Sequence, residues 1–327
     1  MKLTYIDLKY QLENKLQNIE IVELGEADCE KVIELINSVQ PHIPWSEEHF
    51  RWQYFGRIGY QPKLFGAISE KNLIGFYAAV HNSFLLEDAV RDVFMVQDVM
   101  TDENFRGRGI LHILGEMCSA EIDRCGGIGL TFPNEKSAGS FRRTGWTQVM
   151  GVPLLEAKCM QFPSNSSTLV SEISRFETSV NEVWAYSGLH SGIHRDAEYL
   201  NWRYSKPGVQ YLKFLVGNLA GYFVLKLYTG DKAPRVHLLD LVLKKIDIEL
   251  AGEVLEFILS TATDLGASSV TCWLPAGHIY ENYFVNQGFS RADALNRSVF
   301  LRGKPNLDEV SFISSGFHIS QGDSDVF

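Results

Sequence analysis

The stretch of sequence that decides the fold is FMVQDVMTDENFRGRGI, residues 94–110. Its first half is apolar and predicts a strand, and the two glycines near its end come directly before a helical pattern over 110–124. A strand, a glycine-rich turn and a helix in this order leave backbone N–H groups at a helix start, where the helix dipole favours anions. The stretch therefore predicts a loop that holds a phosphate group.

A second set of features follows this loop. A short apolar run over 128–132 predicts another strand, Asn134 comes next, and a helical pattern then ends at Gly145-Trp146. The ordered set resembles the GNAT acyltransferases, whose signature Arg/Gln-x-x-Gly-x-Gly/Ala lies between the fourth strand and the third helix. Arg106 and Gly109 match that signature, whereas Leu111 stands where the family has Gly or Ala.

The resemblance implies coenzyme A, as an acyl-CoA donor. In the family the fourth and fifth strands splay apart, and the pantetheine arm hydrogen-bonds to the fourth strand like an added strand. The positions that this assigns to the cofactor are Val99, Met100 and Thr101 for the arm, Arg106, Gly107, Arg108, Gly109 and Ile110 for the diphosphate, and Asn134, Ser137 and Phe141 beside them. Asn134 is equally well explained as a helix cap, and Ser137 as an exposed helix serine.

Acyl transfer to an amine needs a base for the amine and an acid for the departing thiolate. The family often supplies the acid as a Tyr about four residues before the final Gly-aromatic pair, a position that Phe141 holds here. The usual acid is therefore absent. The candidate bases are Asp98, His81 and Asp325, and a water-mediated route is the alternative.

Aromatic and basic residues are interleaved in two regions where an acceptor substrate would lie, and such a set can stack a base and pair with a diphosphate. The candidate acceptor-binding residues are His42, Trp45, Arg51, Tyr54, Arg203, Tyr204 and Asp323. Ring and arginine clusters also occur in ordinary packing, which is the favoured explanation for Trp52 and Trp202.

The chain also repeats itself. Trp52-Gln53-Tyr54 reappears as Trp202-Arg203-Tyr204, and Asp98 is echoed by Asp240 in the same order. We therefore expect an α/β (α+β) protein of two tandem GNAT-like domains, each a mixed, mostly antiparallel twisted sheet flanked by helices. The predicted boundaries are 1–160 for the domain with the acyl-CoA site, 161–168 for a polar linker, and 169–327 for a degenerate domain and tail that shape the acceptor site.

Only the first copy has the glycine loop. The second has Lys244-Lys245-Ile246-Asp247-Ile248 in its place, where β-branched residues and an acid oppose diphosphate binding. The sequence predicts one coenzyme site per chain.

Composition narrows the class of protein. A net charge of −10 over 327 residues argues against a nucleic-acid surface. The five cysteines are scattered without metal spacing, so we expect reduced thiols and no metal site. No apolar run is long enough to span a membrane, and the first residues lack a signal-peptide core. These features indicate a cytoplasmic enzyme, as a monomer or homodimer.

Tandem GNAT chains with a tail of this kind resemble bacterial N-acyltransferases of surface-polysaccharide pathways. The resemblance implies transfer of an acyl group from acyl-CoA to the amine of a deoxy amino sugar carried on a nucleoside diphosphate. One alternative is a tandem-GNAT aminoacyl transferase of cell-wall assembly that uses charged tRNA. The other is a non-catalytic module that binds acyl-CoA, which the missing Tyr would suit.

Overall fold

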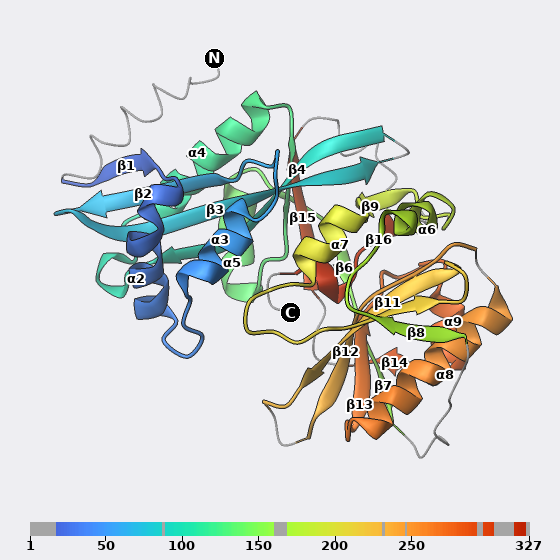
Figure 1. The fold of residues 1–327 in the computed structure, drawn as a ribbon. Coiled ribbons are helices and arrows are strands. Elements are labelled where there is room, and N and C mark those ends of the chain that lie inside the picture. Colours follow the sequence, from blue (N-terminus) through green and yellow to red (C-terminus); the bar gives the residue numbers. More distant parts are fainter. Residues whose placement is uncertain are drawn as a thin grey trace. The chain divides into compact units, whose positions relative to one another are not determined.

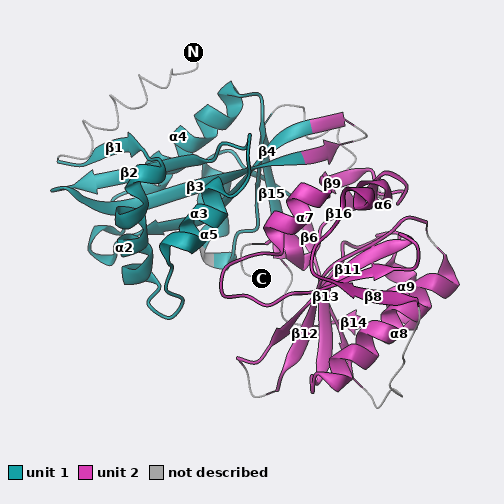
Figure 2. Ribbon diagram, in the orientation of Figure 1, with its two compact units in different colours: residues 1–83, 91–149, 299–310 teal, residues 84–90, 150–298, 311–327 magenta. Residues whose placement is uncertain are grey.

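The computed structural model describes residues 18–86, 89–159, 169–230, 233–245, 247–292, 297–303 and 317–324. The expected linker over 161–168 and Asp325 lie outside these ranges. The chain forms two compact units, drawn in different colours in Figure 2. Unit 1 comprises residues 1–83, 91–149 and 299–310, and unit 2 comprises residues 84–90, 150–298 and 311–327.

Unit 1 is built around a mixed sheet with the strand order β1-β2-β3-β4-β5-β15-β6 (Figure 1). Its strands are β1 (Glu20–Glu23), β2 (Lys63–Ser69), β3 (Asn72–Leu86), β4 (Ala89–Thr101), β5 (Ile128–Thr131), β6 (Thr147–Val152) and β15 (Arg297–Gly303). Its helices are α2 (Cys29–Val39), α3 (Glu47–Phe55), α4 (Ile110–Arg124) and α5 (Glu135–Arg143). β4 and β5 run parallel, whereas β1–β2, β2–β3 and β5–β15 are antiparallel.

Helix α4 forms where the apolar pattern predicted it, over 110–124. Its buried residues recur every three or four positions, so one face of the helix is apolar. That face joins a core with β2, β3 and β4 whose members include Ile113, Leu114, Met117, Phe65, Tyr77 and Phe94. Packing in this core holds the first turn of α4 directly after the turn that follows β4.

Unit 2 repeats this plan, with the strand order β14-β7-β13-β12-β11-β10-β8. Its strands are β7 (Leu154–Lys158), β8 (Val170–Ile173), β9 (Ser191–Ile193), β10 (Leu212–Val216), β11 (Gly221–Tyr228), β12 (Arg235–Leu243), β13 (Ser269–Trp273), β14 (Ser290–Arg291) and β16 (Phe317–His318). Its helices are α6 (Asn181–Ala185), α7 (Ala197–Arg203), α8 (Ile248–Asp264) and α9 (Glu281–Asn286), and a short 3-10 helix, η4, covers Gln321–Asp323.

The parallel pair of unit 2 is β12–β13, with α8 between the two strands in sequence, as α4 lies between β4 and β5. The predicted fold class and the internal repeat are therefore confirmed. Two short strands, β9 and β16, pair in parallel with each other, and β9 also pairs with residues 84–86 at the end of β3.

The predicted boundary at residue 160 is wrong because each unit includes a strand from the other half of the sequence. β7 precedes residue 160, yet it pairs with β13 in the second sheet, from Ser269↔Lys158 to Trp273↔Leu154. Conversely, β15 comes from the far end of the chain and pairs with β5, from Phe300↔Thr131 to Gly303↔Ile128. The compact units accordingly divide at residues 149 and 150.

In the part of the chain that the structure describes, no helix is long and apolar enough to cross a membrane.

Candidate functional site

The parallel ladder between β4 and β5 is short and ends before β4 does, and we call the place where it ends the opening of unit 1. Its rungs run from Val93↔Ile128 to Met95↔Leu130. Immediately beyond, the side chain of Thr131 donates from Oγ1 to the carbonyl oxygen of Val96 at 2.9 Å. β4 then continues to Thr101 with no further rung to β5 among the described pairs. Pairing between β4 and β5 thus ends before Val99, Met100 and Thr101, the residues where the sequence predicts a splay.

Asp98 marks the opening between the two strands. Its φ of +52° lies in the left-handed region, which is uncommon for a residue other than glycine and costs energy within a strand. Oδ2 of its carboxylate accepts a hydrogen bond from the hydroxyl of Tyr54 at 2.8 Å and from Nε2 of Gln97 at 3.2 Å. The carboxylate is partly exposed, whereas Tyr54 is only 4% exposed. Tyr54 therefore holds Asp98 from within the core, which corrects its expected role in contacting the acceptor.

The glycine loop presents an exposed backbone. Gly107 and Gly109 have φ values of +79° and +81°, and a Cβ added at either would meet no atom within 4 Å. Gly109 is the N-cap residue of α4 and has no side chain to bond the amides of the first turn. The amides of a helix start lack intrahelical acceptors. Exposed Arg106 and Arg108 flank this end of the helix and add positive charge. Exposed amides and positive charge at a helix start favour an anion.

The corresponding helix of unit 2 begins differently. Asp247 is the N-cap residue of α8, and its Oδ1 accepts from the backbone N–H of Glu249 at 2.9 Å and of Leu250 at 3.5 Å. A carboxylate of the chain itself thus binds the amides that the glycine loop leaves exposed in unit 1. The single coenzyme site stays a prediction.

The residues expected on the other side of the opening lie on α5. Oδ1 of Asn134 accepts from the backbone N–H of Ser137 at 3.0 Å, so the helix-cap explanation of Asn134 is confirmed. The Ser137 hydroxyl donates back to Asn134. Phe141 is 7% exposed, and its ring packs edge-on against Trp146 with the centroids 5.3 Å apart. Phe141 is a core residue that offers no proton.

His81 does not pair with Asp98. Its Nε2 lies 3.0 Å from Oδ1 of Asp92, and its Nδ1 accepts from the backbone N–H of Gln61 at 3.2 Å. Its ring stacks on Phe94 at 4.6 Å. The prediction that His81 shares a site with Asp98 is wrong because both of its partners on β4, Asp92 and Phe94, precede the opening.

The other acceptor candidates of unit 1 are exposed or partly exposed. Arg51 forms ion pairs with Glu47 and Glu26 on the surface. Trp45 stacks on His49 at 4.0 Å, and its ring centroid lies 6.0 Å from that of Tyr54. His42 is exposed in the loop before α3.

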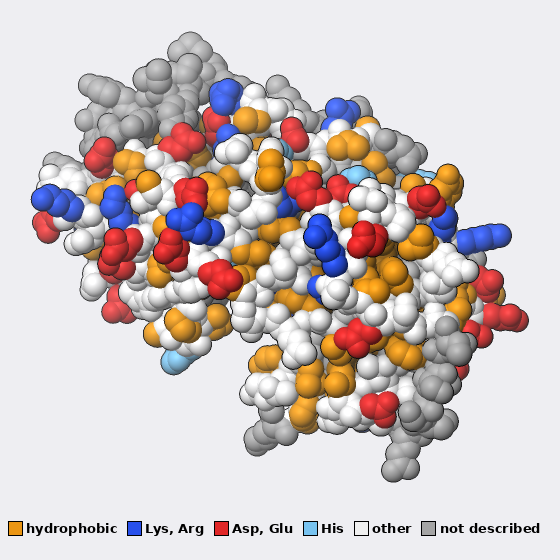
Figure 3. Space-filling view, in the orientation of Figure 1, with side chains coloured by type: hydrophobic (Ala, Val, Ile, Leu, Met, Phe, Trp, Pro, Cys, Tyr) orange, Lys and Arg blue, Asp and Glu red, His pale blue; other side chains and the backbone are white. Residues whose placement is uncertain are grey.

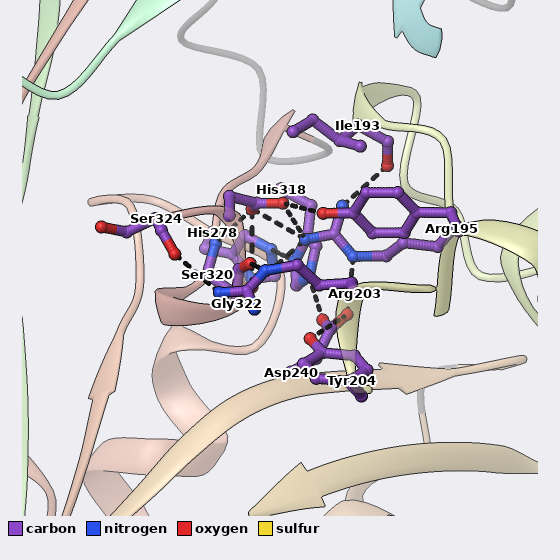
Figure 4. A network of polar contacts seen from close by, with 12 residues as sticks. Ile193, Arg195, Arg203, Tyr204, Asp240, His278, His318, Ser320, Gly322 and Ser324 are labelled. Carbon is purple, nitrogen blue, oxygen red and sulfur yellow. Dashed lines mark hydrogen bonds and ion pairs between the residues drawn. The ribbon is translucent and has the colours of Figure 1, made fainter. Parts of the chain in front are cut away.

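The acceptor candidates of unit 2 are buried in a polar network that the sequence did not predict (Figure 4). Arg195 is fully buried at its centre. Its Nε donates to Oδ2 of Asp240 at 2.8 Å, and its Nη2 donates to both carboxylate oxygens of Asp323 at 2.7 and 2.9 Å. Burial raises the pKa of Asp240, but Arg195 and His318 outweigh it and bring that pKa to about 2. Asp323 is therefore an internal ion-pair partner, which corrects its expected place beside an acceptor.

Arg203 and Tyr204 serve the same network. Arg203 donates to the carbonyl oxygens of Gly322 and Ser324, each at 2.6 Å, and Tyr204 donates to Oδ2 of Asp240 at 3.4 Å. Both residues are at most 5% exposed, so their expected contact with an acceptor is also corrected. The repeat was the available signal, because Tyr204 and Asp240 are the counterparts of Tyr54 and Asp98.

Among the described residues, no group of three or more His, Cys, Asp or Glu side chains could hold a metal ion. On the face drawn in Figure 3, acidic and basic side chains are interspersed, with no continuous basic surface.

No family model and no curated protein matches this sequence. Solved structures do match. A GCN5-related N-acetyltransferase from Anabaena variabilis superimposes with a TM-score of 0.67 at 11% identity, over 87% of this chain and 72% of that one. A probable N-acyltransferase from Enterococcus faecalis gives 0.69 at 12% identity over the same shares. N-myristoyltransferase from Saccharomyces cerevisiae, with bound myristoyl-CoA, gives 0.60 at 10% identity over 89% and 84%.

These likenesses extend over both units and establish the fold. The chain has the tandem GNAT architecture, with two mixed sheets and their helices in one polypeptide.

Proposed function

We propose that the chain is an acyl-CoA-dependent N-acyltransferase whose cofactor site lies in unit 1. The observation that carries this proposal is the glycine-capped start of α4, together with the stretch of β4 that continues beyond its last rung with β5. Free amides, two open glycines and two exposed arginines suit a diphosphate, while the unpaired edge of β4 suits an amide-containing arm. The fold shared with N-acetyltransferases and with a myristoyl-CoA complex supports the same assignment.

Acyl-CoA supplies an acyl group activated as a thioester. For this chemistry we assign Asp98 as the base and Tyr54 as the residue that positions it. The amine nitrogen forms a bond to the acyl carbon as the carbon–sulfur bond breaks, the carboxylate of Asp98 takes the proton from nitrogen, and the thiolate receives a proton from water. The hydrogen bond from Tyr54 fixes the carboxylate in one orientation, which a general base needs.

For the acceptor, we propose the amine of a deoxy amino sugar on a nucleoside diphosphate. The support is the resemblance of the tandem sequence to enzymes of surface-polysaccharide pathways. A second candidate, an acyl-CoA-binding module without activity, is favoured by Phe141, which leaves the family's usual acid position without a hydroxyl.

The cofactor site is tested by calorimetric titration of coenzyme A into matched glycine variants. Gly109 and Gly126 lie at opposite ends of α4, both have positive φ, and neither has an atom near an added Cβ. Gly109→Ala should weaken coenzyme A binding at least tenfold, because the methyl group lies in the diphosphate loop. Gly126→Ala carries the same backbone strain and should bind normally. Equal affinities for the two variants would refute the site.

Activity separates the two candidate functions. Release of the coenzyme A thiol from acetyl-CoA is followed with UDP- and dTDP-linked amino sugars as acceptors. Acceptor-dependent release supports the transferase. Tight binding of coenzyme A without release for any amine supports the binding module.

A further inference from the structure

In unit 2 the parallel pairing of two strands ends at the same place as in unit 1, and we call this place the opening of unit 2. The parallel rungs of β12 and β13 run from Arg235↔Ser269 to His237↔Thr271 and then stop, although β12 continues to Leu243. Asp240 follows the last paired residue of β12 by three positions, as Asp98 follows Met95 on β4. The parallel pairing therefore ends at equivalent points in the two sheets.

In unit 2 the chain's own segment 317–324 lies at this opening. Nε2 of Gln321 is 3.5 Å from Oγ1 of Thr271, the last paired residue of β13. Gly322 lies so close to β12 that an added Cβ would be 2.8 Å from the carbonyl oxygen of Leu239. The segment thus contacts both strands where their pairing ends, and all eight of its residues are buried.

The side chains of unit 2 around this segment contact both its main chain and its carboxylate. Arg203 donates to two of its carbonyl oxygens, at Gly322 and Ser324. Arg195 forms a two-oxygen ion pair with the carboxylate of Asp323, and Nε2 of His318 lies 2.9 Å from Oδ1 of Asp240. The hydroxyl of Tyr204 lies so close to Gly322 that it would collide with a Cβ at that position. Unit 2 thus contacts three features of the segment: the carbonyl oxygens of Gly322 and Ser324, the glycine at position 322, and the carboxylate of Asp323.

Charge is balanced within the network. Arg195 and Arg203 contribute two positive charges, and Asp240 and Asp323 contribute two negative ones. One of the two negative charges arrives with the segment itself. Without the segment, Arg195 would be left buried with one carboxylate partner fewer, which is costly for a fully buried cation.

We infer that the opening of unit 2 is a peptide-binding site whose ligand is the chain's own Gly-Asp-containing segment, 317–324. The segment binds in the way a separate peptide would, through β16 alongside β9 and through the Arg195–Asp323 and Arg203–carbonyl contacts. The equivalent opening in unit 1, which under the proposed function receives the acyl-CoA arm, is left for the cofactor. The peptide site itself does not depend on that function.

The test uses the full chain with a protease recognition sequence in place of residues 308–313. The protein is folded intact and then cut, and native mass spectrometry follows the fragment 314–327. We expect the fragment to stay bound without its covalent link. Asp323→Asn should increase its release rate at least tenfold, whereas Asp264→Asn, at an exposed position on α8, should leave the rate unchanged. Loss of the unmodified fragment from an otherwise folded protein would overturn the inference, as would equal release rates for the two variants.

A displacement assay covers the case in which a variant chain does not fold. A labelled synthetic peptide of residues 314–327 is exchanged into the cut wild-type protein and followed by fluorescence anisotropy. Unlabelled peptide that carries Asp323→Asn or Gly322→Ala should compete at least tenfold more weakly than the natural sequence. Equal competition by a scrambled peptide would refute a specific site.

Discussion

The hydroxyl of Tyr54 donates a 2.8 Å hydrogen bond to the carboxylate of Asp98, and their counterparts in the repeat, Tyr204 and Asp240, form the same pair at 3.4 Å. In each pair the aspartate lies on the strand, three positions beyond its last parallel rung, and the tyrosine lies at the end of a helix, α3 or α7. The surroundings of the two aspartates differ. Asp98 is partly exposed, whereas Asp240 is fully buried and bound to Arg195. A ligand can therefore reach the carboxylate of Asp98, whereas the carboxylate of Asp240 is enclosed in an ion pair inside unit 2.

Replacing Tyr54 by Phe should lower kcat about tenfold with little change in KM, because the carboxylate remains but loses its fixed orientation. Tyr60→Phe is the matched control, since its hydroxyl bonds Ser83 rather than Asp98. Steady-state kinetics with saturating acyl-CoA measure both. A loss of the same size in both variants would place the effect in the fold of unit 1 and not in the base.

Asp98→Asn should reduce kcat/KM by about 10²-fold, the usual scale for a positioned base. Asn tolerates positive φ and still accepts the hydrogen bond from Tyr54, so the free energy of unfolding should stay near the wild-type value. Kinetics and urea denaturation are measured on the same preparation. Full activity in this variant at neutral pH would mean that the proton leaves through water.

Arg195→Met should lower the free energy of unfolding of unit 2 by about 3–5 kcal/mol, because two buried carboxylates lose their shared partner. Lys244→Ala removes a surface ion pair to Glu182 in the same unit and should change stability little. Thermal and denaturant unfolding report both. Similar stabilities for the two variants would show that the buried network contributes no more than a surface pair.

Acidification should destabilise unit 2. Burial lowers the pKa of His278 and of His318 below the ordinary value of 6.5, with Arg195 adding to the effect, and burial brings the pKa of His237 to about 4. Because these values are lower in the folded than in the unfolded chain, the unfolded chain binds more protons once the pH falls below about 6.5. Stability is therefore complete above that pH and declines below it, by up to about 1.4 kcal/mol per pH unit for each histidine.

Unfolding measured between pH 7.5 and 5 tests this decline. Asp240, with its pKa near 2, stays ionised throughout and adds no slope of its own. His278→Gln should reduce the slope without abolishing it, since His318 and His237 remain. A wild-type stability that is constant over this range would contradict the assignment of neutral histidines.

The sequence predicted what depends on local pattern. The bounds of α4, the glycine loop that precedes it and the cap at Asn134 follow from periodicity and residue type. The repeat related Tyr204 to Tyr54 and Asp240 to Asp98, but it did not predict that each tyrosine bonds its aspartate. It could not show that Arg195 and Asp323 are buried, because a charged residue distant from its partner in sequence is usually read as a surface residue.

The sequence also could not assign two strands to their sheets. β7 and β15 are short apolar segments, and nothing in their composition states which edge each will join. The pairing is decided by the free edges of β13 and β5, far away in the chain.

The exchange of these two strands bears on how the protein is made. The sheet of unit 1 is complete only when residues 297–303 have been synthesised, near the end of the chain. A nascent polypeptide that has emerged as far as residue 150 holds the glycine loop but presents β5 with an unpaired edge, a surface prone to wrong pairing. We therefore expect the sheet of unit 1 to be completed only after most of unit 2 has been translated, in contrast to the usual order in which an amino-terminal domain folds first. Gene halves cut at the middle should yield active material only when they are produced together in one cell.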